Sequence, residues 1–179
     1  MTRWKFLVPV TAAAVLFGAA LLVHHVSTSV DRDGGDSHNH IDPLDLHDSP
    51  PQVVASNAIS VILSWRPNSD TSSWDALHRA APMLTGPLAA AAAAPPNPPP
   101  RPVQQWSAWA AANDTISASA TVLGEPLIRG DTATVTVAAT QTVLHPGGKT
   151  TPHRRAVLKV TLTRTANLWR VANYTEETR

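Results

Sequence analysis

The spacing of apolar residues predicts that helices come first in the folded part of the chain and strands afterwards. Between residues 52 and 66 apolar side chains recur at every third or fourth position, which is typical of a helix with one buried face: Val54, Ala58, Ile62 and Trp65. Ser49 followed by Pro50 predicts the start of this helix, with Ser49 as N-cap and Pro50 as its first residue. Pro67 predicts its end near Trp65.

A second helix is expected after residue 72, because Ser72 and Asp75 have the spacing of a capping box. Its apolar stripe continues through Trp74, Leu77, Ala81, Leu84 and Leu88. Pro82 should kink or break it, and "TGP" at residues 85–87 indicates a new helix start. A further short helix is expected in "VQQWSAWAAAN", which follows the proline-rich stretch "PPNPPPRP" at residues 95–102.

Four segments then alternate strictly between apolar and polar residues, which predicts half-buried strands of an antiparallel sheet. They are "TISASATVL", "DTATVTVAATQTV", "RAVLKVTLT" and "LWRVANYT", separated by turn sequences at residues 129–131, 145–149 and 165–167. The predicted fold is therefore α+β, with about three helices packed on a curved four-stranded antiparallel sheet across residues 52–176. Neither flank of residues 95–102 can fold alone, so the proline-rich stretch is interpreted as a stiff loop inside this domain.

Before the domain, the hydropathy pattern predicts a membrane anchor at residues 6–25, after a short cytoplasmic tail at residues 1–5. An uncharged run of 18 residues, Phe6 to Val23, is long enough to span a bilayer and longer than the apolar part of most export signals. Arg3 and Lys5 precede it and mostly acidic residues follow, so the domain should lie outside the cell membrane. A cleaved signal is the alternative.

Residues 26–51 are rich in charge and poor in bulky apolar residues, which predicts a disordered spacer. Six aspartates and three histidines in residues 30–51 also permit a weak metal-binding or pH-responsive tract, but no scaffold would place their ligands.

The composition of the chain bears on which kinds of functional site it can contain. The chain has no cysteine, and its net charge of +1 gives no reason to expect a nucleic-acid partner. The predicted inward positions of the strands are apolar, and the polar residues expected to line the interior are Gln141 and Asn173. The acids lie at caps, turns or the terminus, His78 is isolated on a helix, and His145 and His153 flank one turn without a third metal ligand. We therefore expect no enzymatic activity, no metal site and no cofactor.

The last two strands carry a basic set that could attract anionic lipid or cell-wall polymers, although a solvated sheet face is the simpler interpretation: Arg154, Arg155, Lys159 and Arg170.

This layout resembles a known group of proteins. An anchor, a spacer, paired helices ending in "MLTGPLA" (residues 83–89) and strands ending in "LWRV" (residues 168–171) resemble actinobacterial Mce-associated membrane proteins. They are also similar to conjugation proteins of the type IV secretion assembly-factor kind, whose outer domains adopt a nuclear-transport-factor-like (cystatin-like) cone. The proline-rich stretch departs from that pattern.

The resemblance implies a non-enzymatic scaffold or assembly subunit of an envelope transport complex, with other envelope or secretion proteins, or a second copy of itself, as partners. A binding module for a small apolar or lipid ligand is the alternative.

Overall fold

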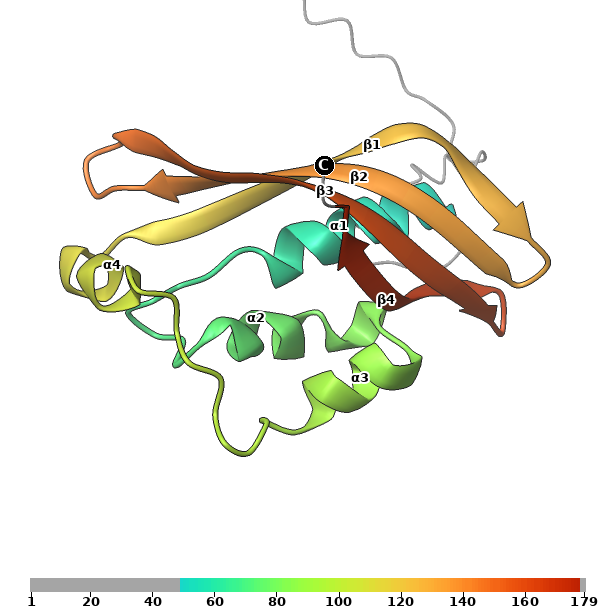
Figure 1. Ribbon diagram of the computed structural model, residues 1–179, viewed down its shortest axis with the longest axis horizontal. Helices are drawn as coiled ribbons and strands as arrows, with labels where there is room; N and C mark the ends of the chain where they lie inside the picture. Colours follow the sequence, from blue (N-terminus) through green and yellow to red (C-terminus); the bar gives the residue numbers. More distant parts are fainter. Residues whose placement is uncertain (1–48, 178–179) are drawn as a thin grey trace, which may run out of the picture. The chain divides into compact units, whose positions relative to one another are not determined.

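The computed structural model describes residues 49–177, which form an α+β domain with the helices before the sheet (Figure 1). The predicted anchor at residues 6–25 and nearly all of the predicted spacer lie outside these residues. Within residues 49–177, no helix is both long and apolar enough to cross a membrane.

The first helix, α1 (Pro51–Ile62), begins and ends differently from the sequence-based prediction. Pro50, not Ser49, is its N-cap, and Pro51 is its first residue. The backbone of Pro50 is extended (ψ 154°) because a residue that precedes a proline is excluded from the helical region. Trp65 lies beyond the end of α1, where its backbone exchanges two hydrogen bonds of 2.9 and 3.0 Å with Ile116.

The next helices are short, and their starts agree with the sequence. In α2 (Ser73–Arg79) the Ser72 hydroxyl accepts a hydrogen bond from the Trp74 amide, and the Asp75 carboxylate accepts one from the Ser72 amide, which confirms the capping box. The break expected at Pro82 is the 3₁₀ turn η1 (Ala81–Met83). The helix α3 (Gly86–Ala93) follows, and α4 (Trp106–Ala112) ends at Asn113, which adopts a left-handed conformation. Residues 49–177 thus contain four α-helices rather than three.

The sheet is an antiparallel meander in which each strand pairs with the next one along the chain. Its strands are β1 (Thr115–Arg129), β2 (Thr132–Leu144), β3 (Thr150–Thr165) and β4 (Leu168–Glu176), in the spatial order β1-β2-β3-β4. The register shifts in each of the three strand pairs, between Leu123 and Leu127, between Gln141 and Thr142, and between Thr161 and Leu162. These irregularities determine which face several polar residues occupy.

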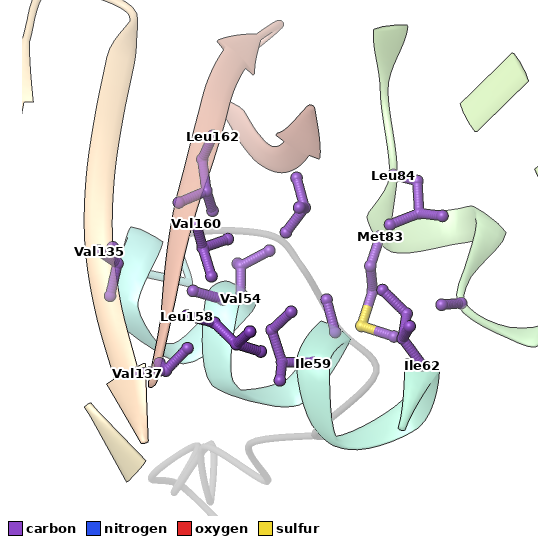
Figure 2. Packing of buried hydrophobic residues seen from close by; sticks show 14 of the residues in the cluster. Val54, Ile59, Ile62, Met83, Leu84, Val135, Val137, Leu158, Val160 and Leu162 are labelled. Carbon is purple, nitrogen blue, oxygen red and sulfur yellow. The ribbon is translucent and has the colours of Figure 1, made fainter. Parts of the chain in front are cut away.

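The core lies between α1 and one face of the sheet. Val54, Ile59 and Ile62 of α1 face the predicted inward residues of β2 and β3, with Met83 and Leu84 closing one side (Figure 2). These strand residues are almost entirely buried: Val135, Val137, Leu158, Val160 and Leu162. Because burial of each such side chain contributes about 1.5–3 kcal/mol, this layer is the main source of stability.

The described helices all lie on one side of the sheet (Figure 1). On its other side, every second residue of β2 is half-buried or exposed, and most of these residues are threonines: Thr132, Thr134, Thr136, Thr140 and Thr142. This threonine-rich surface is called the outer face below. Threonine suits a strand that packs on one side only, because its branched side chain favours extended backbone and its hydroxyl remains solvated.

Candidate functional site

A cavity of about 350 Å³ lies between α1, α2, the proline-rich segment and the inner face of the sheet. Trp65 follows α1, and Trp74 and Leu77 belong to α2. Pro96 and Pro100 come from the segment between α3 and α4, so the proline-rich stretch forms one wall of this cavity. Arg154 of β3 and Tyr174 of β4 also line the cavity.

The two tryptophans in this wall are fixed by their own hydrogen bonds. The indole N–H of Trp74 donates to the carbonyl oxygen of Ala91 at 2.9 Å, and that of Trp65 donates to the carbonyl oxygen of Ile62 at 3.1 Å. His78, predicted as a helix-surface residue, stacks on Trp74 with the ring centroids 5.0 Å apart. Because both indole N–H groups are already bonded, the rings act in this cavity through their apolar surfaces.

Arg154 lies on the inner-face side of β3 with its side chain 44% exposed, which separates it from the other members of the basic set expected from the sequence. Its cross-strand partner is Gln141, and cross-strand partners lie on the same face of a sheet. The shift between Gln141 and Thr142 leaves His153 without a partner in the ladder, and Arg155 and Lys159 project from the other side. Arg170 turns toward η1 and donates from Nε to the Pro82 carbonyl at 3.4 Å. The four basic residues therefore do not form one surface.

The predicted interior residues Gln141 and Asn173 have different positions. Gln141 is 2% exposed and donates from Nε2 to the Leu63 carbonyl oxygen at 2.7 Å, so it lies in the interior as predicted. Its Oε1 is buried and has no hydrogen-bond partner among the described residues. Asn173 is exposed, contrary to prediction, because the shift between Thr161 and Leu162 leaves Ala172 unpaired and reverses the alternation of β4.

Tyr174 takes the inward position that Asn173 was expected to occupy. Burial raises the pKa of its hydroxyl above the ordinary value of 10.0, and the positive charge of Arg154 opposes this rise only in part. The hydroxyl is therefore protonated at neutral pH and can donate a hydrogen bond.

His145 and His153 bind different partners. The imidazole of His145 has Nδ1 2.8 Å from the Asp114 carboxylate and Nε2 2.9 Å from the Thr151 hydroxyl. His153 meets the Trp109 ring edge-on at 4.9 Å. The Asp114–His145–Thr151 set has the connectivity of a proton relay, but no cavity described here includes these residues. We interpret it as a clasp that joins the start of β1 to the β2–β3 turn.

Sequence inspection missed both the clasp and the aromatic cavity. The register pairs Thr115 with Leu144, so Asp114 and His145 extend the same ladder by one position. Counting back from the turn at residues 129–131 would place Gly147 opposite Asp114, because the register shift between Leu123 and Leu127 moves the pairing by two positions. No sequence signal unites Trp74, Pro96 and Arg154 either, because these residues meet only through the packing of helices on the sheet.

A larger hollow of about 630 Å³ lies between the end of α1 and the start of β1, and two of its polar side chains, Arg79 and Ser64, are already hydrogen-bonded. Arg79 contacts Asp70 at 2.6 and 3.0 Å and the Ser64 carbonyl at 2.9 Å. The Ser64 hydroxyl accepts from the Ala118 amide at 3.0 Å. The smaller aromatic cavity, whose lining combines apolar rings with the guanidinium of Arg154, is the stronger candidate for a ligand site.

Comparison with known proteins does not identify a family for this chain. No protein-family model and no curated protein sequence matches the chain. A solved structure, that of the intermembrane space region of the chloroplast protein ARC6, is similar over 72% of this chain and 97% of that one, with 12% identity and a TM-score of 0.33.

Proposed function

We propose that this chain is a single-pass membrane protein whose extracytoplasmic domain, a nuclear-transport-factor-like cone, is a scaffold or assembly subunit of a cell-envelope transport or conjugation complex. The observation that carries the proposal is an exposed apolar cluster at the end of the β1–β2 hairpin. The cluster consists of Leu123 and Leu127, which are 44% and 56% exposed and pair with the outer-face residues Thr136 and Thr134. Ile128 is 49% exposed, but it pairs with the buried Ala133 and so lies on the opposite face of the sheet. Grouped apolar side chains of this size on a surface are typical of protein interaction sites.

The cluster is a product of local structure. Leu123 pairs with Thr136 and Leu127 with Thr134, so the register shift between them places the two leucines at consecutive positions of the outer face. Gly124, at φ +70°, provides a backbone conformation that other residues adopt only with strain. The register shift therefore places two apolar side chains next to each other among the polar threonines. The result is an apolar centre surrounded by polar residues, as in many protein interfaces.

The proposal is tested by affinity isolation of the full-length protein from detergent-solubilised membranes of its own host. We expect co-purified envelope proteins to be lost from the double variant Leu123→Ser/Leu127→Ser. Leu144→Ser is the matched control, because Leu144 is a partly exposed leucine at the opposite end of the sheet. Recovery of the unaltered protein as a partnerless monomer would refute the proposal, as would equal recovery of partners by the double variant.

A further inference from the structure

The aromatic cavity carries an inference that does not depend on the outer face. At about 350 Å³ its volume exceeds the lower limit of about 300 Å³ that is common for small-molecule sites. Its walls combine two tryptophans, a tyrosine and two prolines with Leu77, so the shape and chemistry of the lining favour a flat apolar ligand.

Among the residues from 49 to 177 that line this cavity, Arg154 is the one with a charged side chain. Its Nη2 donates to the Glu176 carboxylate at the end of β4, which leaves further N–H donors of the planar guanidinium for a second acceptor. The Glu176 side chain is 46% exposed, so it can turn toward water when another anion approaches. A guanidinium at the edge of an aromatic pocket matches a carboxylate on a planar ring, because its fork binds both oxygens.

Neutral hydrogen-bonding groups lie beside this cation. The protonated Tyr174 hydroxyl is a donor in the same lining. Gln141 is the cross-strand partner of Arg154 and bonds to Leu63, another lining residue, while its Oε1 has no partner among the described residues. Gln141 is 2% exposed and does not line the cavity, so Tyr174 is the one of these two side chains that a ligand can contact.

We propose that this cavity binds a small planar aromatic carboxylate, with the ring against the tryptophan and proline walls and the carboxylate on Arg154. Recognition is divided between the walls, which select a flat apolar body, and the guanidinium, which selects the anion. Glu176 competes with the ligand for the same cation and so limits its affinity.

The test is equilibrium dialysis of the full-length protein in detergent with naphthalene-2-carboxylate, using protein-free micelles to subtract partitioning. We expect saturable binding, and at least about tenfold weaker binding of the neutral naphthalene-2-carboxamide, because the amide loses the charge-assisted bond. Arg154→Gln should weaken binding of the carboxylate by a similar factor. Glu176→Gln should strengthen it, since the competing carboxylate is gone.

Arg155→Gln is the matched control, because Arg155 is the adjacent arginine on the outer face. It should leave the dissociation constant unchanged. Trp74→Leu tests the wall independently and should weaken the carboxylate and the carboxamide alike, with folding checked by circular dichroism. Equal affinity of the Arg154→Gln and Arg155→Gln variants would overturn the proposal, and so would the absence of saturable binding at millimolar ligand. Neither result would affect the proposed protein interaction, which depends on Leu123 and Leu127.

Discussion

The Asp114 carboxylate lies 2.8 Å from Nδ1 of His145, although 31 residues separate them in sequence. Asp114 is almost fully buried, with its side chain 6% exposed. His145 in turn contacts the Thr151 hydroxyl. This arrangement connects the residue before β1 to both sides of the β2–β3 turn.

Asp114→Ala should destabilise the domain by about 1–3 kcal/mol, because it leaves the imidazole without its buried acceptor. Urea unfolding measures this loss. Asp131→Ala is the control, since its carboxylate is 76% exposed and lies 3.7 Å from Arg164. It should change the free energy of unfolding by less than about 0.5 kcal/mol. Equal effects of the two variants would contradict a structural role for the clasp.

Ser72→Ala should cost about 1 kcal/mol, because it removes the side-chain acceptor at the start of α2. Ser73→Ala, one residue later, is the control and should be neutral or slightly stabilising, since alanine has the higher helix propensity. Amide hydrogen exchange in residues 73–79 distinguishes the two: exchange should accelerate only in the Ser72 variant. Similar protection in both variants would show that the cap is unimportant.

Stability should fall at low pH through Asp75. Partial burial raises the pKa of this carboxyl, but hydrogen bonds from the Ser72 amide and from the Thr71 hydroxyl and amide outweigh burial, so the pKa lies below its ordinary value of 3.8. The stabilisation is therefore fully present above the unfolded-state pKa and disappears as pH falls through the lower folded-state pKa. Unfolding measured from pH 6 to pH 2 should show a difference between the native chain and Asp75→Asn that shrinks below about pH 4. A constant difference would contradict the assignment.

Gly124→Ala should destabilise the β1–β2 hairpin by about 1 kcal/mol, because alanine is strained at φ +70°. No heavy atom lies within 4 Å of the added methyl group, so backbone strain is the whole effect. Thermal unfolding measures it, with Ser119→Ala as a control in the same strand. A neutral Gly124 variant would mean that the bulge does not need its glycine.

Leu162→Ala should cost about 2–5 kcal/mol, because it opens a hole in the layer between α1 and the sheet. Leu127→Ala makes the same chemical change at a side chain that is 56% exposed and should have little effect on stability. Denaturant unfolding compares them. If the two variants lost similar amounts of unfolding free energy, Leu127 would belong to a second hydrophobic core, which would contradict the proposed interaction surface.

The sequence predicted best what depends on local rules. The alternation through Ala133, Val135 and Val137 gave the buried face of β2 correctly, because β2 has no bulge between residues 132 and 141. The capping box at Ser72 and the break at Pro82 were confirmed because a cap and a proline act on their immediate neighbours.

The errors arose where the backbone departs from a regular period. The unpaired Ala172 places Tyr174 rather than Asn173 on the inner face. A binary pattern does not reveal such bulges, since it records only which residues are apolar. Arg154 follows the regular alternation through Leu158 and Ala156, so regular strands predict its place on the inner face. The position of Tyr174 depends on the unpaired Ala172 and could not be predicted in this way.

The meander has a consequence for how the domain is completed during synthesis. Each strand pairs with its immediate predecessor, so the hairpins can close in the order in which the ribosome releases them. The segment after η1 cannot do so: the Thr85 amide bonds to the carbonyl of Val171 at 2.9 Å, and Leu84 bridges the same residue. A nascent chain that stops before β4 would leave η1 and part of the apolar face of α1 open to water, so completion of the final nine-residue strand protects newly made copies from aggregation.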